Sequence, residues 1–308
     1  MTLYVITGGA GFIGSHLADH LLADGHQVRI LDDFSTGKAA NVDPLCEVVR
    51  GDITDAPTVA AAMAGAAGCF HLAAIASVAR GNEDWLTTHR VNQSGTVTVL
   101  EAARDAGRIP VVYASSAAIY GNPDVPIADE TLPAAPLTAY GADKHGSELH
   151  ARVAFLVHLV PTCGLRFFNV YGPRQDPKSP YSGVISIFAG RIAAGQPITV
   201  DGDGLQSRDF VYVADVVAHL RAAMDTIANT PDALMFNVCT GTPTTILQLA
   251  HAFGHAANQE PEIRHGPPRT GDIRQSLGNP AKAATHLKTR ASTNLQTGLA
   301  ITLASQQG

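Results

Sequence analysis

The sequence has no block of like charges: 21 lysine and arginine residues stand against 27 aspartate and glutamate residues, and the formal net charge is −6. Neither nucleic acid nor an anionic membrane is therefore expected as the main partner. The four cysteines form no C-x-x-C pair, which argues against a metal site or a disulfide framework and favours a reducing compartment. No apolar run approaches the roughly 20 residues that a membrane span needs, and the first residues lack a signal-peptide pattern. We expect a soluble cytoplasmic protein that binds no metal.

Apolar residues, in contrast, make up 45% of the 308 residues and charged residues 16%, so the chain can bury a core. Short apolar runs with strand character lie at residues 3–7, 28–31, 47–50, 69–72 and 111–114, and segments of helical periodicity separate them. Nearly continuous apolar strands are typical of a parallel sheet that is covered on both faces. Strands that alternate with helices indicate βαβ units, and we predict an α/β fold with a doubly wound parallel sheet.

The pattern becomes less regular after residue 168, where proline and glycine cluster over residues 173–183. Helical periodicity returns over 185–194, and strand-like runs follow at 198–200 and 234–238. We predict a Rossmann-type domain over residues 1–168, to whose sheet a segment near 212–240 returns. Most of residues 169–308 are expected to form a smaller α/β domain.

Three glycines follow the first strand with the spacing G-x-x-G-x-x-G, at Gly8, Gly11 and Gly14. The first permits a tight turn with positive φ, the second lets backbone N–H groups approach a pyrophosphate, and the third lets the next helix pack closely on the sheet. The N-terminus of that helix offers unpaired N–H donors and the positive end of its dipole to the phosphates. This context favours a dinucleotide site over the alternative, a turn that uses glycine for steric reasons alone.

Acidic residues end the second and third strands. Asp32 lies 18 residues beyond Gly14, where a carboxylate accepts hydrogen bonds from the adenosine ribose and repels a 2′-phosphate, so NAD is favoured over NADP. A solvated strand end, or a cap for the turn at 35–37, is the alternative. Asp52 is expected to bond the adenine amino group, with Ile53 packed on the ring.

Tyr140 and Lys144 open a predicted helix, and their i, i+4 spacing places both side chains on one face. A free tyrosine, with a pKa of about 10, is a poor base at neutral pH. A nearby ammonium group and an oxidised nicotinamide favour the phenolate. Ser115 and Ser116 follow the fifth strand, at the sheet edge where doubly wound folds bind ligands, and a hydroxyl there is suited to bridge a substrate hydroxyl and Tyr140. An exposed helix pair and a capping serine are the alternatives, but the joint occurrence favours a catalytic site.

These motifs together resemble the extended short-chain dehydrogenase/reductase superfamily, and within it the nucleotide-sugar 4-epimerases typified by UDP-galactose 4-epimerase. The resemblance extends over roughly residues 3–280. The matching stretches are 7–14, 31–37, 51–53, 71–74, 92–96, 114–121, 140–144, 165–174, 201–215 and 269–276.

The resemblance implies a role for each matching position. Tyr140 would be the base, Lys144 its electrostatic partner and a ligand of the nicotinamide ribose, and Ser116 the catalytic hydroxyl. Tightly bound NAD, regenerated in each cycle, would be lined by Gly8, Gly11, Phe12, Ile13, Gly14, Asp32, Asp33, Phe34, Ser35, Thr36, Gly37, Asp52, Ile53, Leu72, Ala73, Ala74, Asn92, Tyr140, Lys144 and Phe167. The UDP-sugar would be lined by Ser116, Tyr140, Asn169, Val184, Thr199, Arg208, Arg269, Asp272 and Ser276.

Within the substrate set, Arg208 and Arg269 would hold the diphosphate, because a guanidinium pairs bidentately with phosphate. Asp272 would bond the uridine ribose. The alternative for the two arginines is a surface salt bridge with Asp209 or Asp272.

Departures from the family pattern narrow the reaction. Ala117 and Ala118 follow Ser116 where the sugar 4,6-dehydratases carry Asp-Glu, so dehydration is disfavoured. Ser276 stands where some members carry a bulky tyrosine, which leaves room for an N-acetyl group at C-2 of the sugar. Some members also place a lysine near Ala76, and this chain does not.

The expected activity is the interconversion of UDP-glucose and UDP-galactose through a 4-keto sugar, with UDP-N-acetylhexosamines also accepted. The alternatives are another nucleotide-sugar oxidoreductase or lyase, such as a UDP-uronate epimerase or decarboxylase or an enzyme acting on dTDP-sugars, and a non-catalytic NAD sensor. The resemblance also implies a homodimer.

Overall fold

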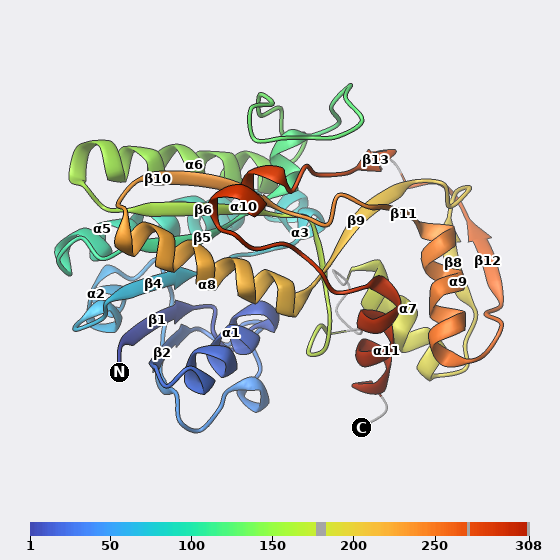
Figure 1. The fold of residues 1–308 in the computed structure, drawn as a ribbon, viewed down its shortest axis with the longest axis horizontal. Helices are drawn as coiled ribbons and strands as arrows, with labels where there is room; N and C mark the ends of the chain where they lie inside the picture. The colour runs from blue at the N-terminus through green and yellow to red at the C-terminus, as the bar shows by residue number, and fades with distance from the viewer. Residues whose placement is uncertain (177–182, 270–271, 307–308) are drawn as a thin grey trace.

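The computed structural model describes residues 1–176, 183–269 and 272–306. The larger of its two lobes is built on a seven-stranded parallel sheet with the strand order β10-β6-β5-β4-β1-β2-β3 (Figure 1). The strands are β1 (Leu3–Thr7), β2 (Gln27–Asp32), β3 (Glu47–Arg50), β4 (Gly68–His71), β5 (Val111–Ser116), β6 (Thr162–Phe167) and β10 (Ala233–Val238). The predicted doubly wound α/β fold is confirmed, and β10 reaches the sheet from a point late in the chain.

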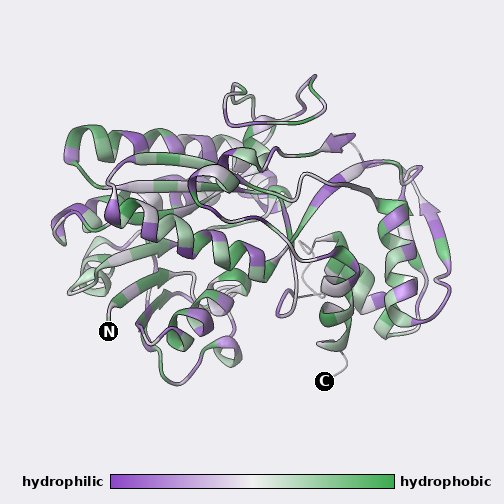
Figure 2. Ribbon diagram, viewed as in Figure 1, coloured by the Kyte–Doolittle hydropathy of each residue, from purple (hydrophilic) through white to green (hydrophobic). Residues whose placement is uncertain are grey.

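Helices cover both faces of this sheet, which explains why its strands are apolar throughout. On one face, Leu17 of α1 and Leu220 of α8 are fully buried in one apolar cluster. On the other, Val59 of α2, Val99 of α5 and Ala151 of α6 belong to a second cluster. In Figure 2 the strands of this sheet are mostly green or pale, whereas α6 alternates between green and purple. The helix bounds are α1 Phe12–Ala23, α2 Ala56–Met63, α3 Val78–Glu83, α4 Trp85–His89, α5 Gly95–Asp105, α6 Ala139–His158 and α8 Val213–Asn229.

The smaller lobe has its own core and two small sheets. One sheet has the order β11-β9-β13 with β7 also paired to β9, and the other pairs β12 with β8. Phe188 of α7 and Phe253 of α9 meet edge to face in the centre of this core. Its strands are β7 Asn169–Tyr171, β8 Ile198–Asp201, β9 Ser207–Tyr212, β11 Pro243–Thr245, β12 Ile263–Gly266 and β13 Gln275–Ser276. Its helices are α7 Val184–Ala193, α9 Ile246–Ala257 and α11 Leu295–Ala304. The short helix α10, Ala281–His286, packs instead against β10 of the larger lobe.

Between α4 and α5 the chain makes one wide π-helical turn, η2, over Arg90–Ser94. Helical periodicity in a sequence does not reveal such a turn. Wide turns of this kind are frequent at functional sites. Here the turn carries Arg90 and Val91, which line the large cavity described below.

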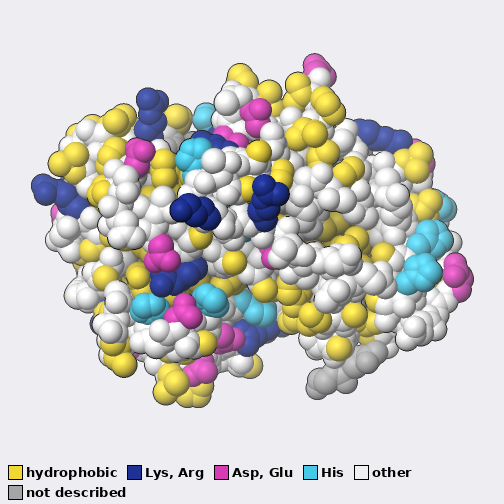
Figure 3. All heavy atoms as spheres, in the orientation of Figure 1, with side chains coloured by type: hydrophobic (Ala, Val, Ile, Leu, Met, Phe, Trp, Pro, Cys, Tyr) yellow, Lys and Arg dark blue, Asp and Glu magenta, His cyan; other side chains and the backbone are white. Residues whose placement is uncertain are grey.

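The surface carries charges of both signs. On the face shown in Figure 3, basic and acidic side chains are interspersed without a large patch of one sign. In the part of the chain that the structure describes, no helix is long and apolar enough to cross a membrane.

Candidate active site

The glycine turn joins β1 to α1, and its geometry tolerates no side chain at two positions. Gly8 has φ +71°, and a Cβ there would lie 2.7 Å from the backbone nitrogen of Ala73. A Cβ on Gly14 would lie 2.3 Å from the carbonyl oxygen of Gly8. Gly11 is the N-cap of α1 and supplies no capping side chain, so N–H groups of the first turn remain available to an anion. This cradle of bare backbone fits a dinucleotide pyrophosphate.

Asp32 lies at the end of β2, and only 7% of its surface is exposed. Its Oδ2 accepts a hydrogen bond from the Ala10 N–H at 2.9 Å and its Oδ1 accepts one from the Phe34 N–H at 2.8 Å. Burial raises the pKa of this carboxyl, and the two backbone hydrogen bonds oppose that shift. Asp32 therefore organises the loop as well as facing the cavity, and its remaining lone pairs can accept hydrogen bonds from ribose hydroxyls.

A cavity of about 580 Å³ runs from Asp32 past the glycine turn to Tyr140 and Lys144. Its volume lies within the usual range for a small-molecule site. The predicted cofactor residues that line it are Gly8, Gly11, Phe12, Ile13, Gly14, Asp32, Asp33, Ser35, Thr36, Gly37, Asp52, Ile53, Leu72, Ala73, Ala74, Tyr140, Lys144 and Phe167.

Two predicted cofactor residues, Phe34 and Asn92, are not part of this lining. Phe34 has φ +59° and stacks under the Arg50 guanidinium, whose carbon lies 5.4 Å from the ring centroid. Asn92 is buried, and its side-chain amide accepts from the Ile75 N–H at 2.8 Å and donates to the Ile75 carbonyl at 3.1 Å. Asn92 thus holds the loop after β4, which itself lines the cavity.

Several cavity residues carry no sequence pattern that assigns them to the site. Arg80 of α3, Arg90 of η2 and Gln175, which follows β7, all line the cavity. Arg90 lies 3.8 Å from Asp52 as an ion pair. Arg80 and Arg90 come from neighbouring segments and Gln175 comes from a distant one, and only the folded arrangement brings them to one cavity.

The predicted catalytic residues meet at one end of the cavity. Tyr140 and Lys144 lie in the first turns of α6, which Thr138 caps by accepting a hydrogen bond from the Gly141 N–H at 3.1 Å. The Lys144 ammonium lies 5.8 Å from the Tyr140 ring centroid and donates to the Ala114 carbonyl at 2.8 Å. Ser116 ends β5 and hydrogen-bonds with the Tyr140 side chain. Residues from two elements, α6 and β5, therefore converge on one point.

Burial dominates the electrostatics of this cluster. It lowers the pKa of Lys144 to about 8, an effect that the nearby Asp143 partly opposes. It raises the pKa of Tyr140, although the hydrogen bond from Ser116 favours the phenolate. The protein alone therefore keeps the phenol neutral at pH 7, and a positively charged nicotinamide beside it would favour the phenolate.

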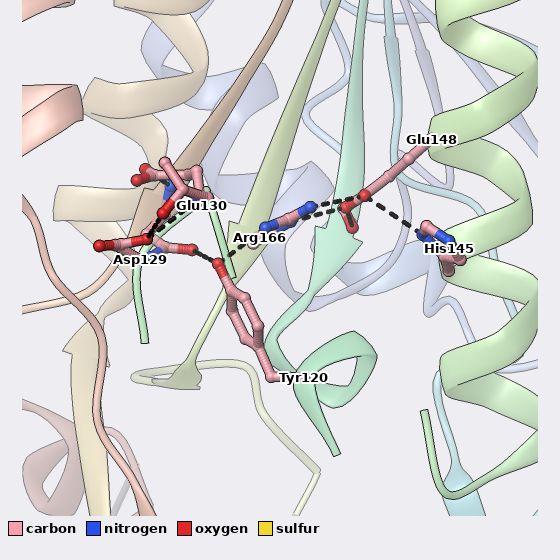
Figure 4. Close-up of polar contacts among 9 residues, drawn as sticks. Tyr120, Asp129, Glu130, His145, Glu148 and Arg166 are labelled. Atoms are coloured by element: carbon pink, nitrogen blue, oxygen red, sulfur yellow. Dashed lines mark hydrogen bonds and ion pairs between the residues drawn. The ribbon is translucent and has the colours of Figure 1, made fainter. Parts of the chain in front are cut away.

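A buried ion pair lies behind the catalytic residues. In Figure 4, Arg166 of β6 lies between Glu148 of α6 and Tyr120, which belongs to the short helix η3 (Ala117–Tyr120). The Arg166 guanidinium donates to both Glu148 oxygens, at 2.9 and 2.8 Å, and to the Tyr120 hydroxyl at 2.8 Å. Ser115, next to Ser116, also donates to Glu148. The network joins α6, β5, β6 and η3, and so supports the elements that carry all three catalytic side chains.

On the substrate side, the structure groups some predicted residues and separates others. Arg208 of β9 lies opposite Ser276 of β13 in the strand register, and its guanidinium forms an ion pair with Asp272 at 2.5 Å. Arg269 pairs instead with Asp201 at 2.5 Å. Thr199 lies on the same strand as Asp201, two residues before it.

The remaining predicted substrate residues lie at the ends of elements. Asn169 is the first residue of β7, and Val184 is the first residue of α7. Both arginines are engaged by carboxylates. Arg208 pairs with Asp272, which the salt-bridge alternative names, whereas Arg269 pairs with Asp201, which it does not name. Asp209 is not one of those partners, because its carboxylate accepts from Thr240 and Gly241.

Comparison with known proteins places the chain in a family. The model of the NAD dependent epimerase/dehydratase family matches residues 4–239, and the chain belongs to this family, within the extended short-chain dehydrogenase/reductases. NAD is accordingly its cofactor.

Among individual relatives, the chain is 38% identical over 307 residues to a UDP-glucose 4-epimerase of Mycolicibacterium smegmatis, covering 97% of this chain and 96% of that protein. It is 33% identical to a UDP-N-acetyl-alpha-D-glucosaminuronate decarboxylase of Bacillus cytotoxicus, covering 85% and 83%. The structure of the Thermus thermophilus UDP-glucose 4-epimerase in complex with NAD superposes with a TM-score of 0.91, at 36% identity and 99% coverage of both chains. The Thermotoga maritima UDP-glucose 4-epimerase with UDP-glucose gives a TM-score of 0.94, at 33% identity and 99% and 98% coverage. The chain is thus an epimerase-type enzyme of UDP-sugars.

Proposed function

We propose that the protein is a UDP-hexose 4-epimerase that interconverts UDP-glucose and UDP-galactose. The observation that carries this proposal is the convergence of Ser116, Tyr140 and Lys144 at the end of a cavity that begins at a bare glycine turn. The likeness to UDP-glucose 4-epimerases over nearly the whole chain supports it.

In the proposed reaction, the Tyr140 phenolate, alongside Ser116, takes the proton of the C-4 hydroxyl. Lys144 stabilises the phenolate and bonds the nicotinamide ribose. When bound, NAD supplies the acceptor and then the donor of the C-4 hydride. Arg208 and Arg269 hold the diphosphate while the 4-keto sugar turns over and presents its opposite face. The residues of the chain therefore supply position and charge.

A second candidate is a decarboxylase or another lyase on the same scaffold, and the likeness to a uronate decarboxylase favours it. A dehydratase is disfavoured, because Ala117 and Ala118 follow Ser116 and neither can protonate a leaving hydroxyl. The epimerase remains the better proposal, since the likeness to a UDP-glucose 4-epimerase is higher, at 38% against 33% identity, and extends over more of the chain.

We also propose that UDP-N-acetylhexosamines are accepted. Ser276 is a short side chain that lines a small cavity together with Ala117 and Phe168. Ala117 directly follows Ser116, so this cavity adjoins the catalytic end of the site. A serine there leaves space beside C-2 of the sugar.

We propose further that the protein is a homodimer formed through α5 and α6. These helices leave apolar side chains exposed: Val97 at 37%, Val153 at 48%, Leu156 at 62% and Val157 at 65%. Contiguous exposed apolar surface marks interaction sites. Light scattering of wild type and Leu156→Glu tests the dimer, and a wild-type monomer would refute it.

We also propose a cytoplasmic location, which the four free thiols of the cysteines support.

An NMR assay without added cofactor tests the activity. Purified protein is incubated in parallel with UDP-glucose, UDP-N-acetylglucosamine and UDP-glucuronate. We expect the first two to reach equilibrium with their C-4 epimers without net accumulation of NADH. Carbon dioxide release from UDP-glucuronate, or net reduction of NAD, would favour the second candidate instead.

A further inference from the structure

A short segment after β7 returns to the larger lobe and packs across α1. Within it, the Pro173 carbonyl accepts a hydrogen bond from His16 Nε2 at 3.0 Å. Arg174 forms an ion pair with Asp19 at 2.7 Å, and Asp176 forms one with Lys38 at 2.9 Å. We call residues 173–176 the clasp segment.

The clasp segment is anchored on α1 and on Lys38, next to residues that line the cofactor cavity. His16 and Asp19 lie in the helix whose N-terminus forms the phosphate cradle. Lys38 directly follows Gly37, which lines the adenosine end of the cavity. The Lys38 N–H also donates to the Ala10 carbonyl at 3.0 Å, within the glycine turn. The three contacts therefore join the clasp segment to both segments that adjoin the glycine turn.

The segment also contributes to the cavity itself. Gln175 lines it, and the Oε1 of Gln175 is buried without a hydrogen-bond partner among the described residues. Its Nε2 donates to the Val170 carbonyl at 3.4 Å. Arg174 has φ +67°, a backbone region that residues other than glycine rarely adopt. A buried acceptor without a donor and a left-handed backbone are both uncommon features that cluster at ligand sites.

We propose that the clasp segment retains NAD, by tying the smaller lobe across the cofactor cavity and thereby slowing dissociation. Release of the dinucleotide requires the segment to lift from α1 and from Lys38. Each exposed ion pair is weak by itself, but both must break, together with the His16 contact, before the cavity opens. The proposal rests on NAD as cofactor and does not require that the reaction be 4-epimerisation.

The test measures release of NAD from the purified holoenzyme, with no sugar present. Free NAD is removed, and the NAD still bound per chain is followed over time by chromatography of the denatured sample. The double variant Lys38→Gln/Arg174→Gln neutralises one member of each pair, and we expect NAD to dissociate about tenfold faster from it. Arg264→Gln is the matched control, because it removes an exposed ion pair, with Glu262, that stays within the smaller lobe. We expect it to release NAD at the wild-type rate.

Exchanging the charges of Asp19 and Arg174 distinguishes loss of their ion pair from a general disturbance of the cofactor site. Asp19→Arg and Arg174→Asp should each accelerate release, and their combination should restore the slow rate, because aspartate tolerates a left-handed backbone better than most residues. Wild-type release rates in the double glutamine variant and in both single reversals would overturn the proposal. So would an equal acceleration by Arg264→Gln, or a swap that stays as fast as its singles.

The outcomes also separate this proposal from the proposed function. A protein that retains NAD through the clasp but converts no UDP-sugar would contradict the epimerase assignment alone. An active epimerase whose clasp variants hold NAD as firmly as wild type would contradict the clasp alone.

Discussion

The buried ion pair behind the catalytic site allows a quantitative test of the structure. The side chains of Arg166 and Glu148 are 8% and 7% exposed, and two parallel hydrogen bonds join them. Arg166→Met leaves the Glu148 carboxylate buried with the Ser115 hydroxyl as its closest donor. Glu148→Met leaves the guanidinium buried with the Tyr120 hydroxyl. Each single substitution therefore leaves a buried charged group without the oppositely charged partner that Arg166 and Glu148 provide for each other.

Stranding a buried charge costs about 3–5 kcal/mol of unfolding free energy. The double variant Arg166→Met/Glu148→Met strands none. It loses the hydrogen bonds of Ser115 and Tyr120, the contact of His145 with Glu148 at 3.7 Å and the stacking of Arg166 on the Tyr120 ring. The Tyr120 hydroxyl still donates to Asn237 at 2.7 Å. The cost of the double substitution should therefore be about 1–3 kcal/mol, well below the sum of the two singles and below either one alone.

Urea unfolding at saturating NAD measures these values, since equal saturation keeps the contribution of the cofactor constant. Arg104→Met is the control for removing an arginine from an ion pair at the surface, where its side chain is 37% exposed beside Glu101 and Asp105. It should cost less than about 1 kcal/mol. Additive losses in the Arg166 and Glu148 variants would refute the pairing, and so would single losses no larger than that of Arg104→Met.

Three further predictions concern the site. Tyr140→Phe should keep NAD bound and lower epimerase turnover by at least about 100-fold, the scale of a lost general base; wild-type-like turnover would remove Tyr140 from that role. Burial lowers the pKa of Lys144 to about 8 from 10.5, so the cost of burying its ammonium group is full below pH 8 and fades as the pH rises towards 10.5. Wild type should therefore gain stability relative to Lys144→Met by up to about 1.4 kcal/mol per pH unit in that window, and parallel pH profiles in urea unfolding of the NAD-free proteins would contradict this. Ser276→Tyr should abolish activity on UDP-N-acetylglucosamine and spare UDP-glucose, whereas equal losses on both in the NMR assay would show that this position does not gate C-2.

The fold of the larger lobe was predictable because the features that determine it leave short patterns in the sequence. A parallel sheet buried on both faces demands continuous apolar strands, and a dinucleotide cradle demands glycine where a Cβ would strike backbone. A Cβ on Gly8 would lie 2.7 Å from the Ala73 nitrogen, and a Cβ on Gly14 would lie 2.3 Å from the Gly8 carbonyl oxygen. The i, i+4 spacing of Tyr140 and Lys144 likewise fixes a shared helix face.

Contacts that cross between elements were not predictable in this way. Glu148 lies one turn after Lys144 and reads as an ordinary polar helix residue, while its partner Arg166 is 18 positions away on a strand. The available signal was Arg166 itself, a charge inside an otherwise apolar strand, which requires a buried partner. Asn92 is a different case. The family pattern assigns it to the NAD site, but the pattern does not reveal that its side chain bonds the backbone N–H and carbonyl of Ile75.

Whether an enzyme of this kind must release its NAD depends on whether the hydride returns to the sugar from which it came. An epimerase returns the hydride to the same sugar, so its NAD leaves each cycle as it entered and gains nothing from exchange. A net oxidoreductase must release reduced cofactor once per turnover, and a tie across the cavity would then limit its rate. The tie that we propose for Arg174 with Asp19 and Asp176 with Lys38 would therefore suit the first class. Wild-type NAD release slower than sugar turnover would be consistent only with a cofactor that stays in place, whereas release faster than turnover would remove this support for the epimerase.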